Sequence, residues 1–584
     1  MSDRRDRPRS SLVTCLLVGC LLVTAISSGV ALGPALAVSA DATRDTASPR
    51  IVAVYPNPVT DEDRGEFVVV DTAGAANLTL SDGESSVSVS APNRSATASV
   101  STPSNTTLVA VSSDPEVARN RTEYPVVAGG LALSNAGETL TLSHGNVTLD
   151  TISYPDAPEG ERWLTSAASG ESDRQQTEPG HWRPFGYEPR GVHTYGETNA
   201  TAFVLPDAAG VPVETLRGAE DRILLAGYTL SSERVADALL AAHDRGVEVE
   251  VLVDDAPVGG IGGREAAVLD RLSSAGISVE VIGTDPARFD FHHPKYAVVD
   301  DAALVTSENW KPAGTGGNGS RGWGVRVDSS AVAADLAGLF RNDSAGRDTT
   351  DWQTERAGEV YESENATTGE YPTRFQPTGY RVERVRVLTA PGNAESAVVG
   401  IVDSAEESVE VIQPAIGGRH QPFLRATVRA AGRGVEVRIL LSSVWYSEEE
   451  NERLVSWLNR IAEERGLSLT ARLADPGGRY EKIHTKGLIV DDETVVVGSL
   501  NWNNNSAREN REVAVALDDP ETARYYRRTF DADWQGGGSD RLPVGLVAAV
   551  ALAVVIALLV ARREVEFEDE SDSGIEDDRE IEWP

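Results

Sequence analysis

Two stretches of this sequence repeat one pattern of residues. The first reads FHHPKYAVVDD from Phe291 to Asp301, and the second reads KIHTKGLIVDD from Lys482 to Asp492. Each contains His-x-Lys, four further residues and Asp, and each is followed by a second apolar run, LVTSENW or VVVGSLNW. The whole sequence holds only four lysines, and three of them, Lys295, Lys482 and Lys486, lie in these stretches, while the fourth is Lys311. These positions therefore need lysine for a specific purpose.

Strand geometry groups the polar residues of each stretch. Successive side chains of a β-strand point to opposite faces, so His293 and Lys295 share a face, as do His484 and Lys486. The apolar run that follows ends in a hydroxyl and an amide, which are Ser307 and Asn309 in the first copy, and Ser499 and Asn501 in the second. An imidazole, an ammonium, a hydroxyl and an amide together suit a bound oxyanion.

The surroundings of the two stretches repeat as well. RGVEV occurs at Arg245–Val249 and again at Arg433–Val437, each time after a buried strand and an amphipathic helix. This order is typical of βαβ units in a mixed or parallel sheet. The spacing predicts two copies of one α/β domain, over residues 199–353 and 381–535, with a linker at 354–380.

The N-terminal part has a different pattern. Residues 48–158 consist of short β-type runs separated by Gly, Asn and Asp turns, which predicts an all-β sandwich. The phrases GEFVVV, LALSNAGETLTL and VTLDTISYPD resemble those of the lamin-tail domain, an immunoglobulin-like module. The resemblance implies an accessory or adhesive role. A polar linker is expected at residues 159–198.

Both ends of the chain carry segments typical of export and membrane insertion. Arginines followed by an apolar run and small residues predict an export signal peptide over residues 1–40. The uncharged run Leu542–Ala561 predicts a transmembrane helix, followed by Arg562, Arg563 and an acidic cytoplasmic tail over residues 562–584. We therefore expect a single-pass protein of the cell membrane whose remaining domains are extracellular. An uncleaved N-terminal anchor is the alternative to a signal peptide.

The charge limits the partners. A formal charge of -37 is spread along the 584 residues, and no basic arm or stripe is present. Tight non-specific binding of nucleic acid normally needs such a stripe. An acidic surface poor in lysine favours a halophilic protein, although a GC-rich genome alone would also replace lysine by arginine.

At this point the motifs resemble a known family. HTKGLIVDDETVVVGSLN fits the phospholipase D superfamily signature, which is His-x-Lys, four residues, Asp, six residues and Gly-Ser-x-Asn. The first copy departs from it by one missing residue and by Thr306 and Glu308. The resemblance implies two α/β units packed face to face around one active site, in a monomer. It assigns catalytic residues and substrate-binding residues as follows: catalytic His293, Lys295, Asp300, His484, Lys486 and Asp491, and substrate-binding Ser307, Asn309, Ser499 and Asn501. Within the catalytic set, Asp300 and Asp491 are expected to support the fold and orient their neighbours rather than react.

These residues suit attack on a phosphodiester without a metal or cofactor. One neutral imidazole attacks phosphorus to give a phosphohistidine, and the other, protonated, gives its proton to the leaving alkoxide. Family members orient the imidazole with an acidic residue, for which Glu512 is the match in the second copy, while the aligned segment of the first copy has Trp323. We therefore expect Glu512 to raise the proton affinity of His484 and leave His293 as the nucleophile.

Three functions fit the sequence. The first is a membrane-anchored extracellular phosphodiesterase that hydrolyses or transfers a phospholipid head group. The second is an extracellular nuclease of the same superfamily, and the third is a non-catalytic adhesin with a degenerate site. The predicted fold class is an N-terminal immunoglobulin-like β-sandwich, two α/β phospholipase D-type units packed as a pseudo-dimer, and a C-terminal transmembrane helix.

Overall fold

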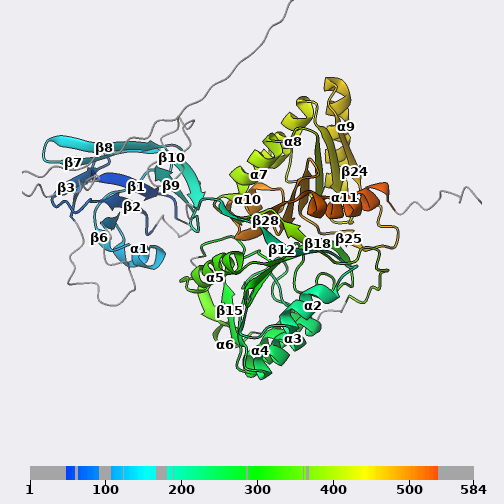
Figure 1. Ribbon diagram of the computed structural model, residues 1–584. Coiled ribbons are helices and arrows are strands. Elements are labelled where there is room, and N and C mark those ends of the chain that lie inside the picture. The colour runs from blue at the N-terminus through cyan, green and yellow to red at the C-terminus, as the bar shows by residue number, and fades with distance from the viewer. Residues whose placement is uncertain are drawn as a thin grey trace, which may run out of the picture. The chain divides into compact units, whose positions relative to one another are not determined.

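The computed structural model describes residues 48–58, 64–90, 107–122, 124–158, 160–165, 180–187, 190–284, 287–359, 361–362 and 367–536. These residues form a β-sandwich followed by two α/β units of like topology (Figure 1). We call the two units together the α/β module. Its first half runs from Thr198 to Glu355 and its second half from Arg384 to Gln535. The predicted signal peptide, residues 1–40, lies outside the described residues.

The sandwich consists of a six-stranded sheet, in the order β10-β9-β1-β2-β5-β6, and a four-stranded sheet, in the order β4-β3-β7-β8. Alternation along the strands sends Val68 and Val70 of one sheet and Leu78 and Leu80 of the other into a common core. The elements are β1 (Arg50–Tyr55), β2 (Phe67–Asp71), β3 (Leu78–Ser81), β4 (Ser86–Val89), β5 (Leu108–Ser112), α1 (Pro115–Arg121), β6 (Val126–Ala128), β7 (Glu138–His144), β8 (Val147–Tyr154), β9 (Glu161–Thr165) and β10 (Gly180–Pro184).

The sandwich extends past its predicted end. Strands β9 and β10 lie in the segment predicted to be a linker, residues 159–198; β9 pairs with β1, and β10 pairs with β9. Strand β9 reads ERWLT and β10 reads GHWRP, so polar residues obscure the alternation that identifies a strand. Their apolar side chains nevertheless reach the core through Trp163 and Trp182.

The two halves of the α/β module share one strand order. Three parallel strands are followed by antiparallel ones in both halves: β15-β14-β13-β16-β17-β18-β12 corresponds to β24-β23-β22-β26-β27-β28-β21. The first half contains β12 (Thr198–Leu205), α2 (Gly210–Arg217), β13 (Arg222–Gly227), α3 (Glu233–Asp244), β14 (Glu248–Asp254), α4 (Gly263–Ser274), β15 (Ser278–Ile282), β16 (Tyr296–Val299), β17 (Ala302–Thr306), β18 (Ser320–Asp328), α5 (Ser330–Ser344), β19 (Thr349–Asp351) and α6 (Trp352–Glu355).

The second half repeats these elements. It contains β21 (Arg384–Ala390), α7 (Ala394–Asp403), β22 (Ser408–Gln413), α8 (Pro422–Gly432), β23 (Glu436–Leu441), α9 (Glu448–Arg465), β24 (Leu469–Leu473), β25 (Lys482–Ile483), β26 (Gly487–Val490), β27 (Thr494–Gly498), α10 (Asn504–Arg508), β28 (Glu512–Asp518) and α11 (Pro520–Gln535). Helices α2, α3 and α4 bury their apolar faces on one side of the first sheet, and α7, α8 and α9 do the same on the second sheet.

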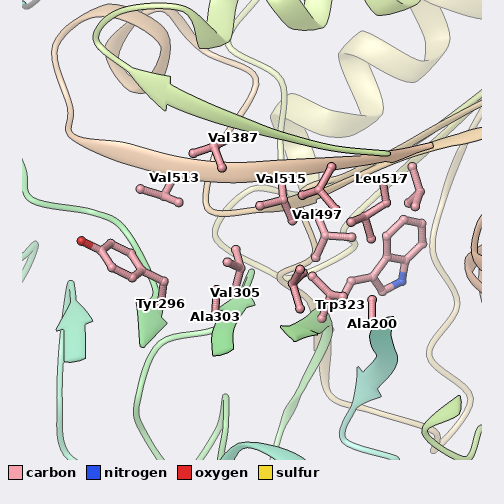
Figure 2. Packing of buried hydrophobic residues seen from close by; sticks show 14 of the residues in the cluster. Ala200, Tyr296, Ala303, Val305, Trp323, Val387, Val497, Val513, Val515 and Leu517 are labelled. Carbon is pink, nitrogen blue, oxygen red and sulfur yellow. The ribbon is translucent and has the colours of Figure 1, made fainter. Parts of the chain in front are cut away.

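The free faces of the two sheets meet in one core. Figure 2 shows Tyr296, Val305 and Trp323 of the first half facing Val515 and Leu517 of the second. Helices α5 and α11 add their apolar faces to the same core. Each large apolar side chain buried in this way contributes about 1.5–3 kcal/mol, so the two halves are held by a continuous interior rather than by surface contact.

The chain also exchanges strands between the halves. Strand β11 (His193–Tyr195), which precedes the first half, pairs with β21 of the second. Strand β20 (Thr378–Val382), which leads into the second half, pairs with β12 of the first. The segment predicted to be a linker at 354–380 is therefore partly a sheet edge.

The predicted fold class needs one correction. In the part of the chain that the structure describes, no helix is both long enough and apolar enough to cross a bilayer. The predicted span Leu542–Ala561 lies outside that part. The fold that the structure describes is therefore a β-sandwich and a two-unit α/β module, without the predicted transmembrane helix.

Candidate active site

Each motif histidine is held by the opposite half of the module. The backbone N–H of His293 donates to the carbonyl of Arg511 at 2.9 Å, and that of His484 donates to the carbonyl of Arg321 at 2.9 Å. Strand β25, directly before His484, pairs in parallel with Ser320 and Arg321 of β18. A parallel bridge joins His292 to Arg511 in the same way. The two motifs therefore meet at the interface of the halves.

The first histidine is hydrogen-bonded across this interface. Nδ1 of His293 lies 2.9 Å from both carboxylate oxygens of Glu512, which belongs to the second half. Burial on its own would raise the pKa of Glu512, but the charge and hydrogen bond of His293 outweigh it, and the pKa lies below its usual value. Burial lowers the pKa of His293 to about 4 against the opposing effect of Glu512. The pair has a carboxylate that stays ionised.

The second histidine meets a different carboxyl group. Nδ1 of His484 lies 3.2 Å from Oε2 of Glu308, a close polar contact that lacks the alignment of a hydrogen bond. Burial raises the pKa of Glu308 to about 8, although Lys486 and Lys311 pull it down. Burial, and next the charge of Lys486, hold the pKa of His484 well below its usual value. At neutral pH the second pair therefore contains a protonated carboxyl group.

These contacts correct the predicted partners. Glu512 was expected to orient His484, and His293 was expected to lack a carboxylate. The structure pairs Glu512 with His293 instead, because each histidine lies on the strands of the other half. Trp323, which was aligned with Glu512, is fully buried in the shared core, where its ring lies 4.8 Å from that of Tyr526.

Both motif lysines are buried beside their histidines. Nζ of Lys486 donates to the carbonyls of His484 at 2.7 Å and Ser307 at 3.4 Å, and Nζ of Lys295 donates to the carbonyl of His293. Burial lowers the pKa of Lys486 to about 7 and that of Lys295 well below its usual value. An anion that enters the site would pair with these ammonium groups and raise their pKa again.

The motif serines and asparagines divide between two tasks. The hydroxyl of Ser307 accepts from the backbone N–H of Trp323 at 3.0 Å, and that of Ser499 accepts from Val513 at 3.0 Å. These serines therefore fix the neighbouring strand. Asn309 and Asn501 follow two residues later, and the side-chain oxygen of Asn309 is buried without a protein partner. The amides are the groups left to face a substrate.

The motif aspartates do not join the site. The carboxylate of Asp300 accepts the backbone N–H groups of Glu220, Asp221 and Arg222 at 2.8–2.9 Å. Asp491 accepts those of residues 406–408 at 2.8–3.0 Å. Both lie at the far end of strands that begin beside the histidines, in a left-handed turn conformation with φ of 52° and 55°. They support the fold, as expected, although the family signature groups them with the catalytic residues.

Two features of the site were missed in the sequence. The ring of Tyr228 lies 4.6 Å from the ring of His293 and 5.2 Å from Nζ of Lys295, so it forms one wall of the site. Arg321 and Arg511 sit directly beside the strand positions that hold the histidines. Arg511 pairs with Asp343 at 2.9 Å, and Arg321 pairs with Asp533 at 2.9 Å, again across the halves. An arginine at matching places in both copies was the available signal.

The arrangement offers two imidazoles whose Nδ1 atoms each lie within 3.2 Å of a carboxyl oxygen and whose Nε2 atoms remain to react. Lys295 and Asn309 flank the strand pair β16 and β17, and Lys486 and Asn501 flank β26 and β27, so these four side chains can supply donors to non-bridging oxygens. Among the described side chains, no group of three or more His, Cys, Asp and Glu residues has the spacing of a metal site. The charges and donors point to a phosphate-type oxyanion as the bound group.

Known proteins are similar to this chain in sequence. The family described as "Cardiolipin synthase, PLD-like domain" matches residues 213–344 and 398–534, one segment in each half. A probable cardiolipin synthase, YwiE, of Bacillus subtilis strain 168 is 24% identical over 401 residues, which cover 65% of this chain and 74% of that protein. A phospholipase D of Rickettsia conorii is 26% identical over 143 residues, which cover 24% of this chain and 65% of that protein.

A solved structure is similar as well. The phosphatidylserine synthase of Haemophilus influenzae Rd KW20 aligns with a TM-score of 0.45 and 14% identity, over 64% of this chain and 94% of that one. The doubled His-x-Lys motif, its position between two packed sheets and the family match to both halves identify the α/β module as a member of the phospholipase D superfamily.

Proposed function

We propose that the α/β module is a phosphodiesterase that hydrolyses or transfers a phospholipid head group through a phosphohistidine intermediate. The observation that carries the proposal is the pair of buried His–Glu contacts, at 2.9 Å and 3.2 Å, which leave one reactive nitrogen on each imidazole. Neither a surface ion pair nor a structural histidine requires this doubled arrangement. The expectation of a non-catalytic adhesin is disfavoured by it.

The reaction takes two steps. In the first, Nε2 of a neutral imidazole forms a bond to phosphorus while the bond from phosphorus to the leaving oxygen breaks, and the second imidazole, as imidazolium, gives its proton to that oxygen. In the second, a water or an alcohol attacks phosphorus, the now neutral imidazole takes its proton, and the N–P bond breaks. Lys295, Lys486 and the two amides hold the non-bridging oxygens during both steps.

A phospholipid is favoured over a nucleic acid by two observations. The matching family and the most extensive relative above are named for cardiolipin synthesis. In addition, exposed apolar side chains stand on two loops, one in contact with Tyr228 beside His293 and one in contact with Lys482, two residues before His484. Val258, 81% exposed, donates its N–H to the hydroxyl of Tyr228, and Tyr446, 55% exposed, lies 5.3 Å from Nζ of Lys482. Trp445, beside Tyr446, is 83% exposed.

Such loops suit contact with hydrocarbon, because moving an exposed apolar side chain from water into hydrocarbon is favourable. Trp445 and Tyr446 would also stack on a base, but Val258 would not. A charge of -37 opposes binding of a polyanion at low salt. A nuclease activity remains the second candidate, because salt screens this repulsion.

We place the reaction outside the cell, on the strength of the predicted export signal in residues 1–40. The test of the function uses the full chain, given phospholipid vesicles and plasmid DNA in parallel, in high salt and with a strong chelator. Release or exchange of the lipid head group, undiminished by the chelator, is expected. Cleavage of the plasmid alone would replace the lipid assignment by the nuclease, and activity that returns only with added divalent ions would overturn the mechanism.

A further inference from the structure

The two halves do not carry equivalent carboxylates. The register follows from the motif serines. Ser307 exchanges hydrogen bonds with the backbone of Trp323, and Ser499 exchanges them with the backbone of Val513. Trp323 therefore corresponds to Val513, and the residue before it, Gly322, corresponds to Glu512. The first half has glycine where the second half has its histidine-binding carboxylate.

The side chain of Glu308 fills the space that a side chain at position 322 would occupy. A Cβ atom placed on Gly322 would come within 2.2 Å of Cγ and 2.6 Å of Oε1 of Glu308. The backbone of Gly322 is not in the left-handed region, so a larger residue is excluded by Glu308 rather than by conformation. Glu308 itself corresponds to Leu500, one residue after the motif serine, and Leu500 packs in an apolar core.

Glu308 is buried with 1% of its surface exposed, close to the phosphate-binding lysines. A carboxyl group in such a position is costly to bury and opposes the binding of an anion. The second half shows that leucine can occupy the matching place. The contact of Glu308 with Nδ1 of His484 explains why a carboxyl group is kept at this position.

We propose that Glu308 is the positioning residue of His484, and that it replaces, from the end of the neighbouring strand, the carboxylate that the second half carries at Glu512. Gly322 is the compensating change that makes room for it. Glu308 accepts the Nδ1 proton of His484 and thereby directs Nε2 toward phosphorus. The inference rests on the proposed function, since it assigns the role through the phosphodiester reaction.

The test moves the carboxylate back to the position used by the second half. Glu308→Leu removes it, and Glu308→Leu/Gly322→Glu restores it at the equivalent of Glu512. We expect Glu308→Leu to lower kcat about 10²- to 10³-fold with little change in KM, the scale of a lost acid–base group. The double variant should recover at least tenfold of the loss. Gly322→Glu alone should be destabilised, because its side chain and that of Glu308 compete for one space.

Two further variants distinguish a positioning role of Glu308 from an effect of its charge. Glu308→Gln keeps an acceptor oxygen but cannot ionise, so it should retain far more activity than Glu308→Leu. Equal losses in both would show a purely electrostatic role. Glu410→Gln is the matched control, because Glu410 is also buried but pairs with Arg438 and Arg527 away from the site. Its stability should fall, and its kcat per folded molecule should not.

A second readout does not depend on turnover. With ¹⁵N-labelled histidine, the imidazole signals of His484, assigned from His484→Asn, report its tautomer. The wild type should carry the proton on Nδ1, and Glu308→Leu should shift His484 toward the other tautomer while the double variant restores it. An unchanged tautomer, or a double variant that is folded but no better than Glu308→Leu, overturns the inference. If no phosphodiester is cleaved by the wild type, the proposed function fails, and the tautomer alone decides this point.

Discussion

The two halves of the α/β module share a strand order, yet each orients the histidine of the other from a different place. The second half reaches across with Glu512 at the start of β28, and the first half reaches back with Glu308 at the end of β17. One carboxyl group is ionised, and the other has a pKa raised by burial to about 8. What the reaction constrains is a carboxyl oxygen near Nδ1, and the strand that supplies it is free to differ.

Separating the two halves should have the largest effect on activity. Each half expressed alone should have no measurable activity, because each keeps a histidine and loses the carboxyl group that orients it. Activity should return when both halves are produced together. Turnover and sedimentation are measured on the same samples. Substantial activity from one half that sediments as a monomer would refute the single shared site.

The next effect concerns the two histidines themselves. His293→Ala and His484→Ala should each lower kcat by about 10³- to 10⁶-fold, the range for loss of a catalytic group. The ionised Glu512 favours an imidazolium at His293, whereas nothing comparable raises the pKa of His484. The reasoning that favoured His293 as nucleophile therefore now favours His484 as nucleophile and His293 as acid.

Peptide mass spectrometry after quenching a slow substrate decides this assignment. Phosphate is expected on the peptide that carries His484. A substrate with a good leaving group, such as a p-nitrophenyl ester, should rescue His293→Ala and should not rescue His484→Ala, because only the acid becomes dispensable. Phosphate on the His293 peptide would restore the original assignment.

The third prediction concerns two arginines that occupy matching positions in the two halves. Arg321 and Arg511 occupy matching positions and bind a buried aspartate of the other half, Asp533 and Asp343. Arg511→Met and Arg321→Met should each lower the free energy of unfolding by about 3–5 kcal/mol. Arg511→Met removes the arginine that binds buried Asp343, and Arg321→Met removes the arginine of buried Asp207 and one of the two arginines that bind Asp533. Urea unfolding measures the effect.

Arg453→Met is the control for these variants. Its partner Glu449 is 85% exposed on α9, and such surface pairs contribute about 0.3–0.5 kcal/mol. A loss below 1 kcal/mol in both interface variants would mean that the apolar core alone holds the halves together.

The smallest effect is on the pH dependence of KM. Lys486 loses its positive charge as pH rises through a pKa of about 7, and Glu308 gains a negative charge as pH rises through a pKa of about 8. Both changes weaken the binding of an anionic phosphodiester, so KM should rise above neutral pH, by on the order of tenfold. Glu308→Gln should lose the later part of the rise. The same profile in Glu308→Gln and wild type would exclude Glu308 as its source.

Much of the molecule was predictable from residues close in the chain. The repeated His-x-Lys stretches, the βαβ order around RGVEV and the turns of the sandwich are local patterns, and each corresponds to observed elements. Strands β9 and β10 escaped because their charged residues hide the alternation. The predicted transmembrane helix, which the described structure does not contain, rested on hydropathy alone.

The partners in the site were not predictable in the same way. Aligning the two copies compares equivalent positions, such as Glu512 with Gly322. The site combines positions that are not equivalent, because β25 and the segment of His292 each pair with the other half. Only the packing of the two sheets shows that Glu512 belongs to His293, and only the space beside Gly322 shows why Glu308 is tolerated.

The reach of Glu512 to His293 also sets a time at which the enzyme can become active. The two residues are 219 positions apart in the chain. At about 5–20 residues per second, the ribosome needs roughly 10–45 s to make that segment after His293 has been added. During this interval the nascent chain carries an imidazole without its carboxylate, so the site stays incomplete until Glu512 has been added and the two halves have packed together.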